Sequence, residues 1–268
     1  MMAFKIISIE GNIGSGKSTL LENLKKHYTD NKHVIFLKEP VDDWEKIKDK
    51  QGNSMLSKFY ADQEKYAFAF QMMAYISRLK ILRDTIKQIQ DNVTITPGLK
   101  DWIEYVKKVE DEDVGFTRLN SMSDQMKHLE GIEDKYVIIT ERSLYTDKHV
   151  FAKMLHDQSK IEDVCYQIYL NWFDEFVKDF PINYSVYVNT QPQKCYERVH
   201  IRARIGEEII PLTYLEDCHN YHEEFLSNSD NKLVLDGNIN IYENEKIVEH
   251  WIEQINTIVI SYTDRKEK

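Results

Sequence analysis

Five short runs of apolar residues, rich in β-branched and aromatic side chains, predict the strands of this chain. They cover residues 4–9, 33–38, 135–140, 184–189 and 232–236. Longer stretches with helical periodicity separate these runs. Apolar strands that alternate with helices form parallel sheets that are buried on both faces. The pattern therefore predicts an α/β fold with a five-stranded parallel sheet and helices on both faces.

The longest predicted helix runs from about Gln63 to Asp91. Because it is apolar on more than one side, we expect it to pack against both the sheet and another element. Residues 92–134 contain a Pro-Gly break, two short amphipathic stretches and an acidic patch. We interpret them as an insertion, which could be a surface element, a lid or part of a dimer contact. No internal repeat or low-complexity linker divides the chain, so we expect a single domain over residues 1–268.

Composition narrows the possible partners and compartments. The 268 residues carry a formal net charge of -10, which argues against a broad surface for nucleic acid or anionic membrane. No apolar run reaches the roughly 18 residues that a membrane helix needs. The three cysteines, Cys165, Cys195 and Cys218, are odd in number and scattered, which suits a reducing compartment. We expect a cytoplasmic protein with no nucleic-acid or membrane partner.

The stretch "GNIGSGKS", which begins at Gly11, fits the phosphate-loop pattern G-x-x-x-x-G-K-[ST] without a mismatch. It follows a predicted strand and opens a predicted helix, so backbone N–H groups and the helix N-terminus would surround phosphate oxygens. Lys17 would neutralise the transferred group, and Ser18 would hold Mg²⁺. The residues expected to bind the phosphates of ATP here are Gly11, Asn12, Ile13, Gly14, Ser15, Gly16, Lys17, Ser18 and Thr19.

The phosphate loop alone leaves three acceptors open: a small molecule, water in a switch or motor cycle, or no acceptor. A switch GTPase needs a guanine-reading N/T-K-x-D motif, which the sequence lacks. A motor ATPase usually carries an acidic residue and a catalytic Glu after the third strand, where this chain reads "TERS". These observations favour a small-molecule acceptor.

Charged side chains follow the second and third predicted strands, at the edge of the sheet where open α/β folds bind ligands. Glu39 is placed to accept a proton from an acceptor hydroxyl. Arg142 could hold this base and the phosphoryl group, and Glu141 could hold Mg²⁺ or its waters. An ordinary surface ion pair is the alternative for each strand end taken singly. Two such ends beside a complete phosphate loop favour a functional site.

Six separated motifs resemble the eukaryotic-type deoxyribonucleoside kinases, the family of deoxycytidine, deoxyguanosine and insect multisubstrate kinases. They read "GNIGSGKST", "EPVDDW", "FAFQMMAYISR", "ITERSLYTDKHVFA", "QKCYERVHIRAR" and "PLTYLEDCHNYHEEFL", in the order of the family. The resemblance extends from Ile9 to about Asp236, and residues 92–134 are longer than the connection usual in the family. It implies a P-loop NTPase fold with an Arg-rich lid, and transfer of the ATP γ-phosphate to the 5'-hydroxyl of a deoxynucleoside in nucleotide salvage.

The resemblance also implies roles for individual residues. Glu39 would deprotonate the 5'-hydroxyl, while Arg142 and Lys17 stabilise the phosphoryl charge and Glu141 supports Mg²⁺. Tyr60 and Glu207 would hold the 3'-hydroxyl, and the amide of Gln71 would face the Watson–Crick edge of the base. The full set implied for the nucleoside is Ile13, Trp44, Leu56, Tyr60, Phe70, Gln71, Arg78, Asp147, Phe151 and Glu207.

Gln71 and Arg78 are seven residues apart and therefore share one face of the predicted helix. An arginine is costly to bury without a partner, and Asp147 resembles the family position that supplies the carboxylate. In the family this pair marks deoxycytidine and deoxypurine kinases. An aspartate accepts from an exocyclic amine and repels the carbonyl of thymine, which could discriminate on the order of a hundredfold. We expect thymidine to be a poor substrate.

Arg198, Arg202 and Arg204 follow a predicted helix start at Pro192 and could close over the triphosphate, as the lid of the family does. A solvated basic face is the alternative. The family often has two acids directly after the lid, and here Gly206 takes the first of those places. The resemblance further implies a homodimer that is inhibited by deoxynucleoside triphosphate end products.

Three alternatives to this function stay open. A nucleoside monophosphate kinase shares the fold, but it would need basic residues where this chain has Glu39 and Glu207. A nucleotide-binding module without catalysis would not need Glu39 and Arg142. A broad-specificity deoxynucleoside kinase would accept thymidine as well, if the Arg78–Asp147 pair does not set the specificity.

Overall fold

Five parallel strands form one sheet, with the order β2-β3-β1-β4-β5. The computed structural model describes residues 4–92, 135–204, 206–227, 229–241 and 243–263. The strands are β1 (Phe4–Glu10), β2 (Val34–Leu37), β3 (Tyr136–Glu141), β4 (Tyr184–Asn189) and β5 (Lys232–Asp236). The predicted parallel sheet is confirmed, and each predicted strand boundary lies within one residue of the observed one.

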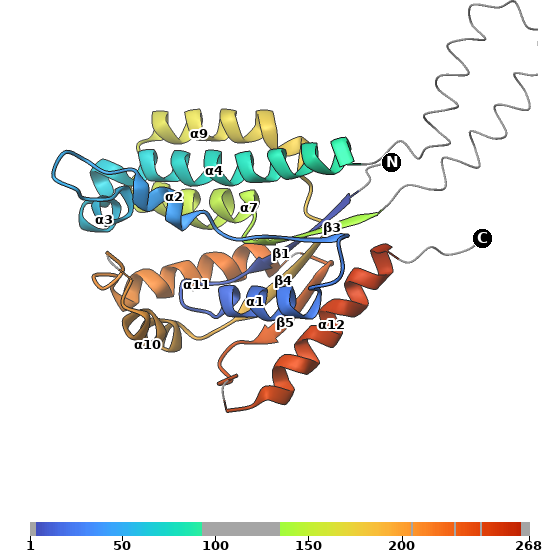
Figure 1. Cartoon of the computed structure of the whole chain (residues 1–268). Coiled ribbons are helices and arrows are strands. Elements are labelled where there is room, and N and C mark those ends of the chain that lie inside the picture. Colours follow the sequence, from blue (N-terminus) through green and yellow to red (C-terminus); the bar gives the residue numbers. More distant parts are fainter. Residues whose placement is uncertain (1–3, 93–134, 205, 228, 242, 264–268) are drawn as a thin grey trace, which may run out of the picture.

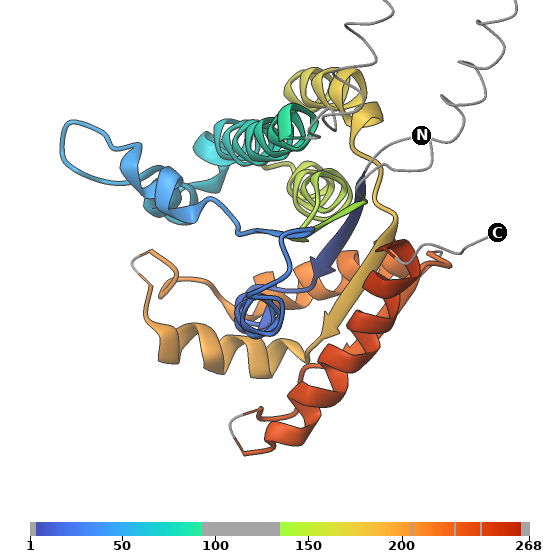
Figure 2. The ribbon, with the colours of Figure 1, turned by 45° about the vertical axis from the view of Figure 1, so that its right-hand side comes forward.

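Helices cover both faces of the sheet, as Figure 2 shows. On one face lie α1 (Lys17–His27), which follows the phosphate loop, and α12 (Glu245–Thr263). Successive side chains of a strand point to opposite faces. Ile7 and Ile9 of β1 accordingly join the apolar cluster that contains Leu24 of α1 and Trp251 of α12, whereas Ile6 faces the other side.

The second face is built around the long helix α4 (Gln63–Asn92), which lies beside α9 (Asp163–Phe176) in Figure 1. Tyr75 of α4 is fully buried against Tyr169 and Phe173 of α9. The helix also contacts η1 (Asp147–Ala152), a short π-helical segment after β3. Because it has neighbours on two sides, α4 is apolar on more than one side, as the sequence predicted.

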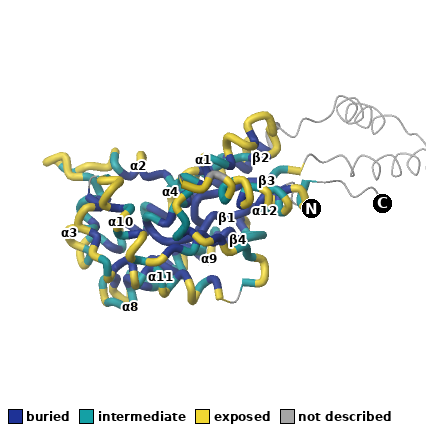
Figure 3. Tube along the Cα trace, turned by 90° about the horizontal axis from the view of Figure 1, so that it is seen from below, coloured by how far each residue is buried: buried dark blue, intermediate teal, exposed yellow. Residues whose placement is uncertain are grey.

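The remaining elements complete this face and surround the carboxyl ends of the strands, except η2, which precedes β4 and packs with the amino ends of β1 and β3. They are α2 (Val41–Lys46), α3 (Met55–Ala61), α7 (Leu144–Thr146), α8 (Lys153–Asp157), η2 (Val177–Asp179), α10 (Pro192–Arg202) and α11 (Leu212–Ser227). α10 begins at the predicted Pro192, whose fixed φ suits the first turn of a helix. Figure 3 shows the strands as a buried centre, with exposed stretches on the outer elements.

Two predictions about organisation extend beyond these elements. The predicted insertion over residues 92–134 lies outside the described residues except for Asn92, the last residue of α4. The single-domain organisation stays a prediction. Of the helices that the structure describes, none combines the length and apolarity that a membrane crossing requires.

Candidate active site

A cavity of about 790 Å³ opens at the carboxyl ends of β1, β2 and β3. Its volume is in the range of small-molecule sites, about 300–1,000 Å³. All but two of the residues that the sequence assigns to a site line this cavity. The exceptions are Gly11 and Asn12, the first two residues of the phosphate loop; the side-chain amide of Asn12 donates to the Leu215 carbonyl at 2.8 Å.

The phosphate loop joins β1 to α1, and its backbone is pressed against α10. Gly14 has a φ of +76°, and a Cβ atom there would lie 2.6 Å from the Cys195 carbonyl oxygen. Only glycine meets both demands, the left-handed backbone and the close approach. α10 therefore supports the loop that would receive the phosphates. The remaining loop residues that line the cavity are Ile13, Ser15, Gly16, Lys17, Ser18 and Thr19.

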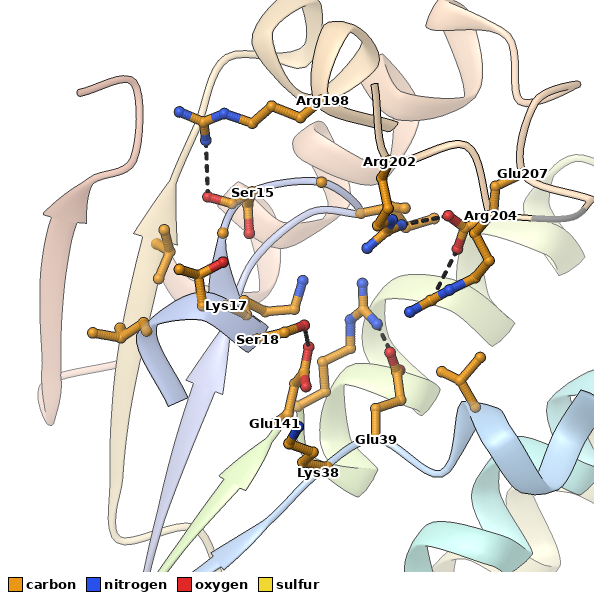
Figure 4. Close-up of a pocket in the computed structure, with 18 of the residues that line it drawn as sticks. Ser15, Lys17, Ser18, Lys38, Glu39, Glu141, Arg198, Arg202, Arg204 and Glu207 are labelled. Atoms are coloured by element: carbon orange, nitrogen blue, oxygen red, sulfur yellow. Dashed lines mark hydrogen bonds and ion pairs between the residues drawn. The ribbon is translucent and has the colours of Figure 1, made fainter. Parts of the chain in front are cut away.

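Lys17 is buried, and its Nζ donates to the Asn12 carbonyl at 2.6 Å. Burial, with a further contribution from Arg142, lowers the pKa of Lys17 to about 7, although Glu141 and Glu39 act in the opposite direction. A phosphate group placed here would favour the charged ammonium. Figure 4 shows Lys17 and Ser18 together on the loop side of the cavity.

The Ser18 hydroxyl donates to Glu141 Oε1 at 2.6 Å. This hydrogen bond joins the first turn of α1 to the end of β3, and both residues line the cavity next to the phosphate loop. A hydroxyl and a carboxylate are hard oxygen donors, and Mg²⁺ is usually bound by one or two such groups together with phosphate oxygens and waters. The donor set therefore fits Mg²⁺.

Glu39 lies at the end of β2 and is held by two buried arginines. Its Oε1 accepts from Arg142 Nη1 at 2.6 Å and from Arg78 Nη2 at 3.0 Å. Burial raises the pKa of Glu39, but Arg142, Arg78 and Lys17 outweigh it and lower this pKa to about 2. The contact of Arg142 with Glu39 was expected from the sequence, whereas the contact of Arg78 was not, because helical spacing gives the face on which a side chain lies and not how far it reaches.

Arg142 has a φ of +59°, in the left-handed region that non-glycine residues seldom occupy. Its backbone N–H continues the sheet by donating to the Ile9 carbonyl at 2.9 Å. The guanidinium lies 5.0 Å from the centroid of the Phe151 ring, a cation–π distance. Such strained residues concentrate at functional sites, where neighbouring contacts hold them. Here Glu39 and Phe151 hold the side chain in the cavity.

One part of the cavity is lined by aromatic and apolar side chains that form a slot. Phe70 meets the Trp44 ring edge to face at 5.5 Å, and the indole N–H of Trp44 donates to the Ser77 hydroxyl at 2.8 Å. Ile13, Leu56 and Phe151 line the same cavity. Flat apolar walls of this kind suit the faces of a nucleobase.

Three polar side chains lie in this slot, and all are buried. Arg78 Nε donates to Asp147 Oδ2 at 2.9 Å, so the structure forms the pair that the sequence suggested. Gln71 is 2% exposed, and its Oε1 has no hydrogen-bond partner among the described residues. A buried acceptor without a donor is costly. A ligand that offers an N–H at this position would remove that cost.

The lid arginines lie on the opposite side of the cavity. Arg202 and Arg204 both pair with Glu207, the latter at 3.2 Å (Figure 4). Arg198 instead donates to the Ser15 carbonyl at 3.2 Å. Burial raises the pKa of Tyr60, and the nearby Glu207 raises it further, so the Tyr60 hydroxyl stays protonated.

Gly206 explains why the chain departs from the double-acid pattern. Its φ is +86°, and a Cβ atom there would lie 3.1 Å from Ser57 Cα and 2.9 Å from Ser57 Oγ. An acidic side chain has no room at this contact between the lid and α3. Glu207, one residue later, is buried in the cavity wall.

One wall of the cavity was not predicted from the sequence. Ile239, Ile241, Val248 and Trp251 line the part beyond the phosphate loop, on α12 and the segment before it. Their spacing is that of ordinary core residues, and Trp251 also packs in the core. The sequence held no signal that would separate a residue that lines the cavity from one that only packs in the core.

Comparisons with known proteins agree with this geometry. A family model described as "Deoxynucleoside kinase" matches residues 7–96 and 114–260. A fowlpox virus protein named "Probable deoxycytidine kinase" is 31% identical over 226 residues, which cover 83% of this chain and 72% of the relative. Deoxycytidine kinase of Mus musculus is 28% identical over 238 residues, with 83% and 75% covered. Deoxycytidine kinase 2 of Gallus gallus is 29% identical, with 95% and 90% covered.

The matched residues include the phosphate loop, both charged strand ends and the lid arginines. The fold beneath them is a parallel sheet covered on both faces, with a nucleotide-binding loop after its central strand. The chain therefore belongs to the deoxynucleoside kinase family and is a kinase of the P-loop α/β class.

Proposed function

We propose that the enzyme transfers the γ-phosphate of ATP to the 5'-hydroxyl of a deoxynucleoside whose base carries an exocyclic amine, in nucleotide salvage. Deoxycytidine, deoxyadenosine and deoxyguanosine would be preferred over thymidine. The observation that carries this proposal is the buried Arg78–Asp147 pair, in a slot where Gln71 Oε1 has no partner among the described residues. The names of the relatives support it: the viral one is named a probable deoxycytidine kinase, and the vertebrate ones are named deoxycytidine kinases.

In this proposal Glu39 is the general base. The 5'-oxygen attacks the γ-phosphorus, the bond from that phosphorus to the bridging oxygen of ADP breaks, and the hydroxyl proton passes to Glu39. A pKa of about 2 makes Glu39 a weak base in the empty site. ATP would bring negative charge to Lys17 and Arg142, the cations that lower this pKa, so the basicity of Glu39 would rise when the donor binds.

The other charged residues have distinct roles in the same step. Lys17, Arg142 and the lid arginines would neutralise charge on the phosphates, and Ser18 and Glu141 would hold Mg²⁺. Mg²⁺ supplies charge neutralisation at the transferred group. Tyr60 and Glu207 would hold the 3'-hydroxyl at the side of the cavity that faces the lid.

We also propose that two copies associate through α4 and α9. Ile76 on α4 and Val164, Ile168 and Trp172 on α9 are 42–59% exposed. Large apolar side chains gathered on neighbouring helices are typical of an interface. All three cysteines are free, which suits the cytoplasm where we propose the enzyme acts.

A third part of the proposal concerns inhibition by end products. The base slot and the phosphate loop belong to one continuous cavity. A deoxynucleoside triphosphate could therefore place its base against Gln71 and its phosphates near Lys17, and so occupy both substrate positions.

A substrate panel tests the acceptor. ATP-dependent phosphorylation would be measured for deoxycytidine, deoxyadenosine, deoxyguanosine and thymidine, and for the corresponding monophosphates. We expect turnover of the first three, with thymidine lower by about a hundredfold in kcat/KM. Efficient turnover of thymidine would show a broad-specificity kinase, and turnover of monophosphates alone would overturn the proposed acceptor.

The variant Glu39→Gln tests the base. We expect kcat to fall by about 10²–10⁴-fold, the usual contribution of general-base catalysis, while the Kd for ATP stays within a few-fold of wild type. Ser261→Ala on the outer part of α12 serves as the matched control. Unchanged turnover in Glu39→Gln would remove Glu39 from the mechanism.

A further inference from the structure

Arg78 makes more contacts than base recognition requires. Its Nε and Nη2 donate to the two carboxylate oxygens of Asp147 at 2.9 and 3.3 Å. Its Nη1 donates to the Glu141 carbonyl at 2.7 Å, and Nη2 also donates to Glu39 Oε1 at 3.0 Å. Arg78 is 3% exposed. A single fixed guanidinium therefore joins α4, the end of β3, η1 and the end of β2.

The contacts of Glu39 are all on one oxygen. Oε1 accepts from both Arg78 and Arg142, and no hydrogen bond from the described residues reaches Oε2. Two donors from different elements fix the plane of the carboxylate. They leave Oε2 available to a hydroxyl in the cavity, where Figure 4 shows Glu39 directed.

We infer that Arg78 is a positioning residue for the general base, and that through it the reading of the nucleobase at Asp147 is coupled to proton transfer at Glu39. This inference rests on the proposed function and deepens it. Specificity would then be expressed in the rate of the chemical step as well as in binding.

The coupling follows from the hydrogen-bond capacity of Arg78. Nη2 carries two hydrogens, and these go to Asp147 and Glu39. A base with an amine would donate to Asp147 and leave both contacts in place. A base with a carbonyl at the same position offers an acceptor to the guanidinium instead. The fifth N–H of the guanidinium is the second one on Nη1, whose other hydrogen goes to the Glu141 carbonyl. From the edge that faces Asp147, formed by Nε and Nη2, Arg78 could satisfy the base carbonyl only by giving up a carboxylate contact. If Nη2 gives up its contact to Glu39, Glu39 loses one of its two anchors.

The first test compares two substrates of the wild-type enzyme. Deoxyuridine differs from deoxycytidine at the base edge by a carbonyl in place of the amine, with the accompanying change at the ring nitrogen. We expect kcat for deoxyuridine to be at least tenfold lower, beyond any change in KM. Equal kcat values with a difference confined to KM would overturn the inference and leave the proposed function standing. No phosphorylation of any deoxynucleoside by the wild type would overturn both.

The second test measures the pH profile of kcat for Arg78→Leu and Arg78→Lys with deoxycytidine. Removing a cation from Glu39 raises its pKa, so the acidic limb of the Arg78→Leu profile should move to higher pH and the plateau should fall at least tenfold. Lysine restores the charge but not the planar fork. In Arg78→Lys the acidic limb should therefore return to its wild-type pH, while the plateau value of kcat should stay low.

Gln71→Leu is the matched control, since Gln71 lies about two helical turns from Arg78 in the same slot and has no hydrogen bond to Glu39 among the described residues. It should change KM and leave the acidic limb in place. If Arg78→Leu fails to fold because Asp147 is left unpaired, the double variant Arg78→Leu/Asp147→Asn removes both charges and should show the same displaced limb. If the folded variants keep the wild-type pH of the acidic limb and the wild-type plateau value of kcat, Arg78 acts in base recognition alone.

Discussion

At the scale of single residues, the cavity brings together charges that burial alone would neutralise. Arg78, Arg142 and Asp147 are buried and the Glu39 side chain is 13% exposed, yet each is paired within a connected network. Such a network costs desolvation energy and is favourable only when its geometry is satisfied. Lys17 lies beside this network, and burial together with Arg142 lowers its pKa, because its hydrogen-bond partner is a neutral carbonyl and not a carboxylate.

This state of Lys17 predicts a pH dependence for ATP binding. With a pKa of about 7 in the free enzyme, Lys17 is largely neutral at pH 8.5, and phosphates would favour its charged form. Binding should therefore take up a proton, and the Kd for ATP should rise by up to about tenfold per pH unit above pH 7. Calorimetry in buffers of different ionisation enthalpy measures this uptake.

The control for this prediction is Lys17→Met, which has no ammonium to titrate. Its affinity should be weak and nearly independent of pH between 7 and 9. Binding by the wild type without proton uptake would show that Lys17 is already charged in the free enzyme.

The Arg78–Asp147 pair and the Arg78–Glu39 contact show which side-chain interactions a sequence can predict. For the first contact, the need of a buried arginine for a carboxylate followed from burial and helical spacing, and the choice of Asp147 as that carboxylate followed from the resemblance to the family. The second depends on where β2 ends relative to α4, which many distant contacts determine. That Gln71 lies on the same helix face as Arg78 could be predicted from spacing. That its Oε1 would lack a hydrogen-bond partner among the described residues could not.

At the scale of elements, the phosphate loop is supported by α10. The variant Gly14→Ala places a Cβ atom 2.6 Å from the Cys195 carbonyl in a left-handed backbone. We expect a loss of roughly 2–3 kcal/mol in the free energy of unfolding. Because the loop must move to relieve the contact, the Kd for ATP should rise at least tenfold. Chemical denaturation and ATP titration measure the two effects.

Gly52→Ala is the matched control for this prediction. Gly52 also has a left-handed backbone, with a φ of +87°, but no atom lies within 4 Å of its added Cβ. It should cost only about 1 kcal/mol and leave ATP binding unchanged. Equal losses in both variants would mean that backbone conformation alone, without the contact to α10, accounts for the effect.

The elements themselves were mostly predictable. The strands are short apolar runs, continuous in the buried β1, β3 and β4, so all five appeared in the sequence with their boundaries. The π-helical η1 was not predicted, because its wider turn depends on how Asp147 and Phe151 are packed after β3. The wall formed with α12 was also missed, since Trp251 serves both the core and the cavity.

At the scale of the whole molecule, the exposed face of α4 and α9 lies on the opposite side of the sheet from α12. We expect Trp172→Glu to shift the enzyme from dimer to monomer, because a buried carboxylate in an apolar interface is costly. Sedimentation velocity at micromolar protein concentration would measure the change. The free energy of unfolding should change little, since Trp172 is 50% exposed in the single chain.

Ile260→Glu provides the comparison, since Ile260 is an isoleucine of α12 with 41% exposure. It should leave the sedimentation coefficient unchanged. A wild type that sediments as a monomer, or two variants that behave alike, would rule out the α4–α9 face as the contact between copies.

The direction of the strands has a practical consequence. In Figure 1 the start of β1, the end of α4, the start of β3 and the end of α12 lie toward one side, away from α3 and α10. The carboxyl ends of the strands, with every charged group of the site, lie toward the other. A surface linker or a fused reporter joined at Phe4 or Thr263 would therefore be attached behind the sheet. An immobilised enzyme would keep its nucleotide entrance facing the solution.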